Sequence, residues 1–129
     1  MKTIKTTKAL LDLADANGRI EVDGDLRIEC GVPWTDCGQK IQALVVRGNL
    51  TLIGDIWTGG GIGVDGDIGA DGSIGAGGGI RAGGDIWAVG YIRADGYIRA
   101  DGDIWANGGI WADGGIGAGA AVKQSEVKW

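Results

Sequence analysis

Aspartate and tryptophan side chains recur in this chain at one constant spacing, and the two series favour a binding role. Asp67, Asp85 and Asp103 form the first series, and Trp87 and Trp105 form the second. A row of carboxylates attracts cationic groups, and exposed aromatic rings are typical of protein interfaces and of surfaces on which sugars stack. The spacing therefore predicts an interaction surface.

Acid–base and metal chemistry find little support in the composition. The chain contains no histidine, which is the commonest general base and the commonest zinc ligand. Two cysteines, Cys30 and Cys37, lack the two further ligands of a structural zinc site, and a bond between them would only close a small loop. Because no base can be paired with a nucleophile, we expect no enzymatic activity, no catalytic residue, no cofactor and no metal.

The negative charge is concentrated in one segment. Residues 54–120 carry 9 Asp and 3 Arg, a net charge of -6, whereas the complete chain has a net charge of -5. Such a surface suits another protein with a basic surface and does not suit direct nucleic-acid binding. Two alternatives stay open: the carboxylates could serve solubility alone, and the rings could shield a slim core by stacking on their neighbours. The further interaction residues that we predict are Asp71, Asp95, Asp101, Tyr91 and Tyr97.

A repeat of six residues carries all of these side chains. Isoleucine occupies every sixth position from Ile56 to Ile116, with glycine two residues before it and threonine, valine or alanine two residues after it. Alternation of apolar and variable residues is the period of an extended strand, whereas a helix would scatter the isoleucines around its circumference. A short fixed period therefore predicts stacked rungs that bury their inner faces against one another.

Three hexads per coil give the best alignment of the outward residues, because only that grouping brings the aspartates and the tryptophans into columns. The sequence thus predicts an all-β fold, a single triangular parallel β-solenoid with 18-residue coils. The frame also extends upstream to Ile20, so the 17 hexads between Ile20 and Ile116 predict nearly six coils.

The chain is expected to divide into three segments. Residues 1–17 hold a short capping helix, predicted over 7–16, whose leucines cover the first coil. Residues 18–119 form the solenoid, and about 30–43 break the pattern as a distorted rung or a protruding loop. Residues 120–129 are expected to close the last coil with a short strand.

Location and membrane contact are also constrained by the sequence. No window approaches the roughly 18 apolar residues that span a bilayer, and the N-terminus lacks the apolar run of a secretory signal. Two cysteines fit a reducing compartment better than a disulfide scaffold. We therefore expect a cytoplasmic protein, in the host cytoplasm if it is encoded by a phage, with no membrane partner.

Two known groups of proteins share features of these repeats. The hexads from Gly66 to Asp113 resemble hexapeptide-repeat β-helix proteins, many of which are acyltransferases. That activity uses a histidine base, so the resemblance implies the fold and carries over no catalytic residue. The blocks 20–28 and 44–52 are similar to bactofilins, the polymer-forming bacterial cytoskeletal proteins with a triangular β-helix.

The leading functional hypothesis is a non-enzymatic acidic protein, such as a phage-encoded inhibitor, that occupies a basic or nucleic-acid-binding surface of a host protein. The resemblance to bactofilins implies the alternative, a polymer-forming scaffold that self-associates through its C-terminal coil. Ice binding is disfavoured because only Thr51 and Thr58 supply threonine to the array.

Overall fold

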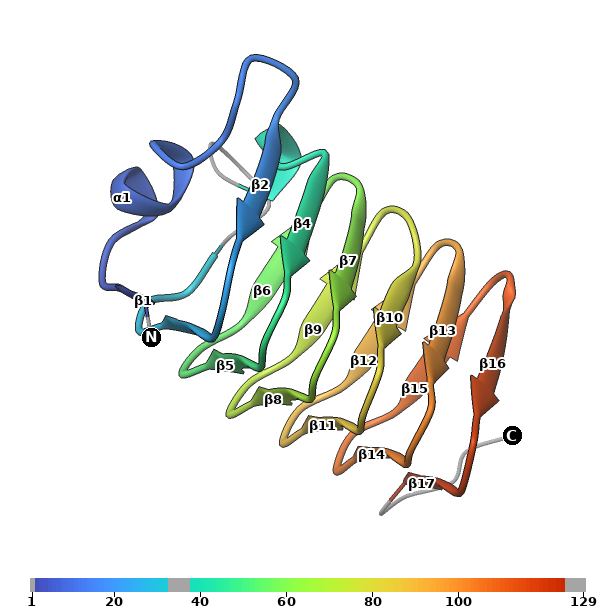
Figure 1. Ribbon diagram of the computed structural model, residues 1–129. Helices are drawn as coiled ribbons and strands as arrows, with labels where there is room; N and C mark the ends of the chain where they lie inside the picture. The colour runs from blue at the N-terminus through green and yellow to red at the C-terminus, as the bar shows by residue number, and fades with distance from the viewer. Residues whose placement is uncertain (1, 33–37, 125–129) are drawn as a thin grey trace.

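Short parallel strands wound around one axis make up nearly the whole molecule. The computed structural model describes residues 2–32 and 38–124. Figure 1 shows the coils stacked side by side, with helix α1 (Thr7–Leu11) near the N-terminal end and strand β17 (Val122–Gln124) at the opposite end. The predicted fold class, a parallel β-solenoid with 18-residue coils, is confirmed.

Three parallel sheets form the walls, and each coil passes through sheet B, then sheet A, then sheet C. Sheet B contains β2 (Arg19–Val22), β4 (Ala43–Val46), β7 (Gly61–Val64), β10 (Ile80–Ala82), β13 (Tyr97–Ala100) and β16 (Gly115–Ala118). Sheet A contains β1 (Lys2–Ile4), β3 (Leu26–Ile28), β5 (Leu50–Leu52), β8 (Ile68–Ala70), β11 (Ile86–Ala88), β14 (Ile104–Ala106) and β17 (Val122–Gln124). Sheet C contains β6 (Ile56–Thr58), β9 (Ile74–Ala76), β12 (Ile92–Ala94) and β15 (Ile110–Ala112).

The strand register follows the hexad frame. In sheet A, Ile86 pairs with Ile104 and Trp87 pairs with Trp105, so that each partner lies three hexads further along the chain. Inward isoleucines from Ile56 to Ile110 and inward alanines from Ala70 to Ala106 are buried, so aliphatic contacts between successive rungs form a continuous core. Each buried isoleucine contributes about 1.5–3 kcal/mol before the entropy of ordering the chain is subtracted.

The coil count inferred from the hexads needs a correction. Four turns of three hexads each run from Leu44 to Ile116, but Ile20 pairs with Leu44 across four hexads. The first coil therefore contains one extra hexad, and the prediction of nearly six coils counted that hexad as a rung. Val32 still pairs with Ile56, so the rung reaches sheet C before the chain departs from the pattern.

The extra length lies in the region predicted to be irregular. A single 3-10 turn, η1 (Gly38–Lys40), precedes β4, and Ile41 behind it is fully buried. Cys30 is a free thiol, and burial raises its pKa. Cys37 lies outside the described residues, as do Val127 and Trp129, whose placement on a closing strand stays a prediction.

The N-terminal helix is shorter than the sequence predicts. Helix α1 (Thr7–Leu11) begins after Thr6, whose Oγ1 accepts a hydrogen bond from the Ala9 N–H at 3.1 Å. Its Leu10 is fully buried against the core. The chain then turns, and Asp15 Oδ1 accepts from the Arg19 N–H at 3.0 Å, because aspartate stabilises such turns better than it stabilises helix interiors. Strand β1, which the sequence analysis did not predict, adds to the edge of sheet A.

The helical part of the structure is small. Within residues 2–32 and 38–124, no helix is long and apolar enough to cross a membrane.

Candidate interaction site

Carboxylates gather along one edge of the solenoid, where each coil turns from sheet B into sheet A. Three residues make each of these turns, for example those between β10 and β11 and between β13 and β14 in Figure 1. We call this line of turns the acidic edge. Its carboxylates are those of Asp23, Asp25, Asp65, Asp67, Asp85, Asp101 and Asp103.

The third residue of each turn forms a hydrogen-bonded ladder along the edge. Asp67 Oδ1 accepts from the Asp85 N–H at 2.7 Å, and Asp85 Oδ1 accepts from the Asp103 N–H at 2.7 Å. Asp103 Oδ1 in turn accepts from the Ala121 N–H at 2.9 Å. The aspartates in this column therefore hold the fold together in addition to carrying charge.

An amide serves equally well in the ladder. Asn49 Oδ1 accepts from the Asp67 N–H at 2.9 Å, and the Asn49 N–H donates to Asp25 Oδ1 at 2.8 Å. The ladder therefore requires an acceptor oxygen at this position, and it does not require a negative charge. This distinction decides which substitutions can test a role for the charge.

Glycine precedes each ladder aspartate for a steric reason. A Cβ at Gly84 would collide with Asp67 Oδ1, and a Cβ at Gly102 would collide with Asp85 Oδ1. Close approach of the backbone to the carboxylate of the preceding coil thus explains the repeated Gly-Asp pair. The sequence alone showed that the pair recurs but gave no physical reason for it.

A second, shorter ladder lies where sheet A turns into sheet C. Asp55 Oδ1 accepts from the Ser73 N–H at 2.7 Å, and Ser73 Oγ accepts from the Tyr91 N–H at 3.1 Å. The same geometry with different side chains indicates that polar residues at these turns accept hydrogen bonds from backbone N–H groups of the next coil.

Two stacked indole rings border the acidic edge on sheet A. The Trp87 and Trp105 rings have centroids 5.5 Å apart and an interplanar angle of 7°, and 39% of Trp87 is exposed. A groove of about 410 Å³ lies between this stack and the aspartate ladder, with Thr51 and Gly69 in its floor. The pair is therefore both packed on a neighbouring coil and open to a partner.

The structure separates the predicted interaction residues into two sets. Six of them share the acidic edge and the adjoining part of sheet A: Asp67, Asp85, Asp101, Asp103, Trp87 and Trp105. The other four lie elsewhere: Asp71 at a turn from sheet A to sheet C, Tyr91 and Asp95 beside β12 in sheet C, and Tyr97 in sheet B.

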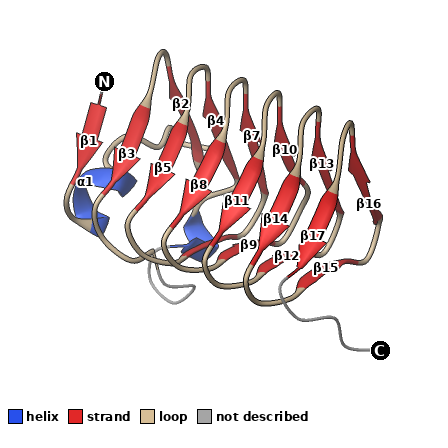
Figure 2. Cartoon of the chain, turned by 90° about the horizontal axis from the view of Figure 1, so that it is seen from below, coloured by secondary structure: helices blue, strands red, loops and turns tan. Residues whose placement is uncertain are grey.

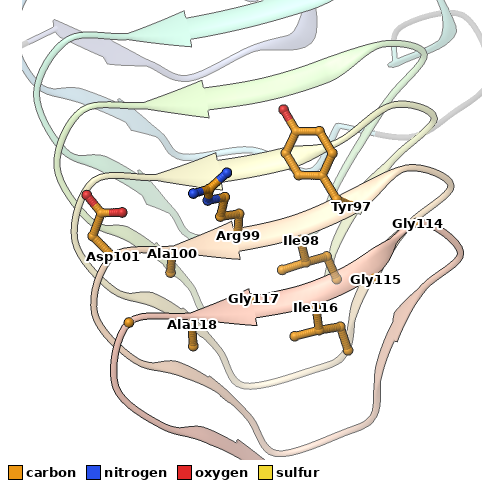
Figure 3. A pocket seen from close by; sticks show the side chains of 11 residues that line it. Tyr97, Ile98, Arg99, Ala100, Asp101, Gly114, Gly115, Ile116, Gly117 and Ala118 are labelled. Carbon is orange, nitrogen blue, oxygen red and sulfur yellow. The ribbon is translucent and has the colours of Figure 1, made fainter.

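Tyr97 belongs to a different surface. Figure 3 shows Tyr97 and Arg99 pointing away from the core, while Ile98 and Ile116 point the opposite way. A shallow cavity of about 600 Å³ lies beside them, because the outward positions of the next strand are Gly115 and Gly117.

Sequence reasoning missed three carboxylates of the edge: Asp23, Asp25 and Asp65. The available signal was the relation of Asp65 to Asp101, which lie two coils apart and stand at the first position of equivalent turns. Asp101 was predicted without its relation to Asp65, and Asp25 was missed because the first coil is one hexad longer, which takes Asp25 out of the 18-residue column of Asp67, Asp85 and Asp103.

Ion pairs near the N-terminal end of the edge involve Glu21. Its Oε1 accepts from Arg47 Nε at 3.2 Å, and its Oε2 accepts from Arg19 Nη2 at 3.3 Å. Arg47 also lies 3.3 Å from Asp23 Oδ1. The hydrogen bond from Arg47, and next that from Arg19, lowers the pKa of Glu21 below its ordinary value of 4.5.

This lowered pKa gives a pH prediction. A carboxyl group with a lowered pKa in the folded state stabilises the fold above its unfolded-state pKa, and that contribution is lost as the pH falls through the folded-state pKa. We therefore expect the free energy of unfolding to decrease below about pH 4.5, and to decrease less in Glu21→Gln. Urea unfolding of both proteins at pH 7 and pH 3 measures this difference, and parallel pH dependences would contradict it.

Among the described residues, no group of three or more His, Cys, Asp or Glu side chains is arranged to hold a metal ion.

Comparison with protein-family models, with curated proteins and with solved structures found no match.

Proposed function

We propose that this protein is a non-enzymatic interaction protein whose acidic edge docks onto a basic surface of another protein, of the kind that otherwise holds a nucleic-acid backbone. One observation carries the proposal: seven of the 17 acidic side chains in the sequence lie on a single edge. A phage-encoded inhibitor of a host protein, acting in the host cytoplasm, is the class that best fits it.

The charge spacing of the edge supports this choice. Asp65, Asp67, Asp85, Asp101 and Asp103 occupy three successive turns. With coils about 4.8 Å apart, these turns place roughly one charge every 3 Å along the axis. One strand of B-DNA carries a charge about every 3.4 Å, so the edge approximates a single phosphate backbone.

The ladder also prepares these carboxylates for binding. Asp67 and Asp85 each use Oδ1 to accept a backbone N–H, which fixes the orientation of the carboxylate before any partner arrives. A fixed side chain loses less conformational freedom on association, and this favours affinity. The adjoining Trp87 and Trp105 supply the aromatic contact area that is common in the energetically dominant part of interfaces.

The test must remove charge without breaking the ladder. Reversal to lysine would remove the acceptor, whereas asparagine keeps it, as Asn49 does. We therefore compare the triple variant D65N/D85N/D103N with the matched variant D71N/D95N/D113N. Each loses three negative charges, but only the first loses them from the acidic edge.

Proteins captured from a cell lysate on the immobilised chain are eluted with duplex DNA, and the affinity of each purified DNA-displaced protein is then measured. The edge variant should bind at least about tenfold more weakly, with a shallower salt dependence, while the matched variant keeps most of the affinity. Equal weakening by the two variants, or capture that DNA does not displace, would contradict the proposal.

A bactofilin-like scaffold is the second candidate, and the C-terminal coil favours it. Ile116 is 41% exposed and Val122 is 45% exposed, whereas their counterparts one coil earlier, Ile98 and Ile104, are fully buried. A second rod could cover this coil by edge-to-edge pairing. Light scattering and negative-stain microscopy test this function: filaments would support it, and a monomer of 13.2 kDa would contradict it.

A further inference from the structure

Sheet C carries a second aromatic cluster, away from the acidic edge. The Trp57 and Tyr91 rings have centroids 6.0 Å apart, and the Tyr91 and Trp111 rings have centroids 6.2 Å apart in an edge-on contact. In Figure 2, β9, β12 and β15 of sheet C lie together on one side of the rod. The cluster therefore spans several coils of one wall.

Trp57 is held flat against this wall. It pairs in register with Gly75, and the atoms nearest to a Cβ built on Gly75 are Cε3, Cζ3 and Cδ2 of the indole. Three atoms of one ring at similar separations mean that a face of the indole covers Gly75, which is buried beneath it. The Tyr91 ring packs beside the indole, with an angle of 58° between the two ring planes. The opposite face of Trp57 is therefore turned outward on a fixed ring.

A cavity of about 330 Å³ adjoins this ring. Its described lining consists of Trp57, Ala76, Gly77, Arg93 and Asp95. Arg93 and Asp95 are exposed, and within the described residues neither forms an ion pair. The cavity thus combines an aromatic wall, a floor of small residues, a group that only donates hydrogen bonds and a group that only accepts them.

We propose that this cavity binds a neutral saccharide, with one pyranose ring against Trp57 and its hydroxyl groups bonded to Arg93 and Asp95. A hydroxyl group both donates and accepts, so neighbouring sugar hydroxyls can satisfy the guanidinium and the carboxylate together. The apolar face of a pyranose matches the indole in shape and polarity. The volume lies at the lower end of the range for small-molecule sites, which suits one or two sugar rings.

The charge of the array excludes anionic ligands from this proposal. Residues 54–120 have a net charge of -6, and such a field repels phosphates and nucleotides. A neutral ligand meets no such repulsion. The site lies on sheet C, so it is independent of the function proposed for the acidic edge.

The test is titration of the ¹⁵N-labelled protein with maltotriose, cellotriose, mannotriose and chitotriose, each followed by NMR of the indole N–H signals. The Trp57 signal, assigned with Trp57→Phe, should shift saturably with at least one of the four sugars. Arg93→Ala and Asp95→Ala change exposed side chains, and each should weaken that binding by about fivefold to tenfold.

One control keeps the result specific. Trp87→Ala removes an exposed ring from sheet A, away from the cavity lining, and should bind the sugar as the unmodified chain does. A Trp57 signal unmoved by all four sugars would overturn the proposal. It would also be overturned by undiminished affinity in both alanine variants, or by tighter binding of adenosine monophosphate than of any sugar.

Discussion

Gly83→Ala is expected to lower the free energy of unfolding by about 1–3 kcal/mol, the usual range for overpacking. Gly83 begins a turn of the acidic edge, and a methyl group there would collide with the backbone carbonyl of Asp65. The two coils cannot separate to make room, because the Gly83 N–H donates to Val64 O at 2.9 Å and the Gly84 N–H donates to Gly66 O at 3.0 Å. Urea unfolding followed by circular dichroism measures the change.

Gly63→Ala is the matched control, one coil earlier on the outward side of β7. A methyl group at Gly63 meets no atom within 4 Å. Alanine also restricts the unfolded chain, so this variant should be more stable than the unmodified protein by up to about 1 kcal/mol. Equal stability of the two variants would mean that the coils are less closely packed at the turn than the geometry requires.

Asp85→Ala is expected to cost about 1–2 kcal/mol of stability, whereas Asp85→Asn should change it by less than about 0.5 kcal/mol. Alanine removes the acceptor that the Asp103 N–H uses at 2.7 Å, while asparagine supplies an equivalent oxygen. The stability loss expected for Asp85→Ala is no larger than this because the turn is exposed, and water can replace part of the lost hydrogen bond.

Chemical denaturation of the two Asp85 variants at pH 7 separates the ladder from the charge. A destabilisation of the same size in both would show that charge, and not the acceptor oxygen, holds the turn. Asp71→Ala provides the comparison at a turn of another edge, where the ladder within the described residues runs through Asp55 and Ser73 instead, and it should stay close to the unmodified protein.

Most of the fold could be predicted because the period of the repeat determines the register of the strands. Residues three hexads apart are neighbours in space, so aligning columns such as Trp87 and Trp105 amounts to aligning strands. The break in the pattern over about 30–43 was recognised, but the sequence left open whether this segment is a distorted rung or a protruding loop. Because the extra hexad before Leu44 preserves the six-residue frame, it was counted as a rung. Strand β1 was missed because three residues carry too little periodicity to be recognised.

The site was predicted less completely than the fold, for a physical reason. Columns in the sequence show which side chains align, but they do not show which turns share an edge, and so Asp65 and Asp67 were not placed together. The role of Asp67 Oδ1 as a backbone acceptor also depends on the distance between coils, which a pattern of residue types does not contain. Contacts between coils therefore had to come from the structure.

The ladder of the acidic edge has a consequence for how such a molecule can change. From Asp67 onward, the ladder bonds of the described residues join each coil to the next, and none skips a coil. Duplication or deletion of one complete coil would therefore leave the remaining bonds intact. Gene rearrangements of that size would lengthen or shorten the protein by whole coils without altering its cross-section, and the choice of coil would set the change in charge, since residues 61–78 have a net charge of -3 and residues 79–96 a net charge of 0.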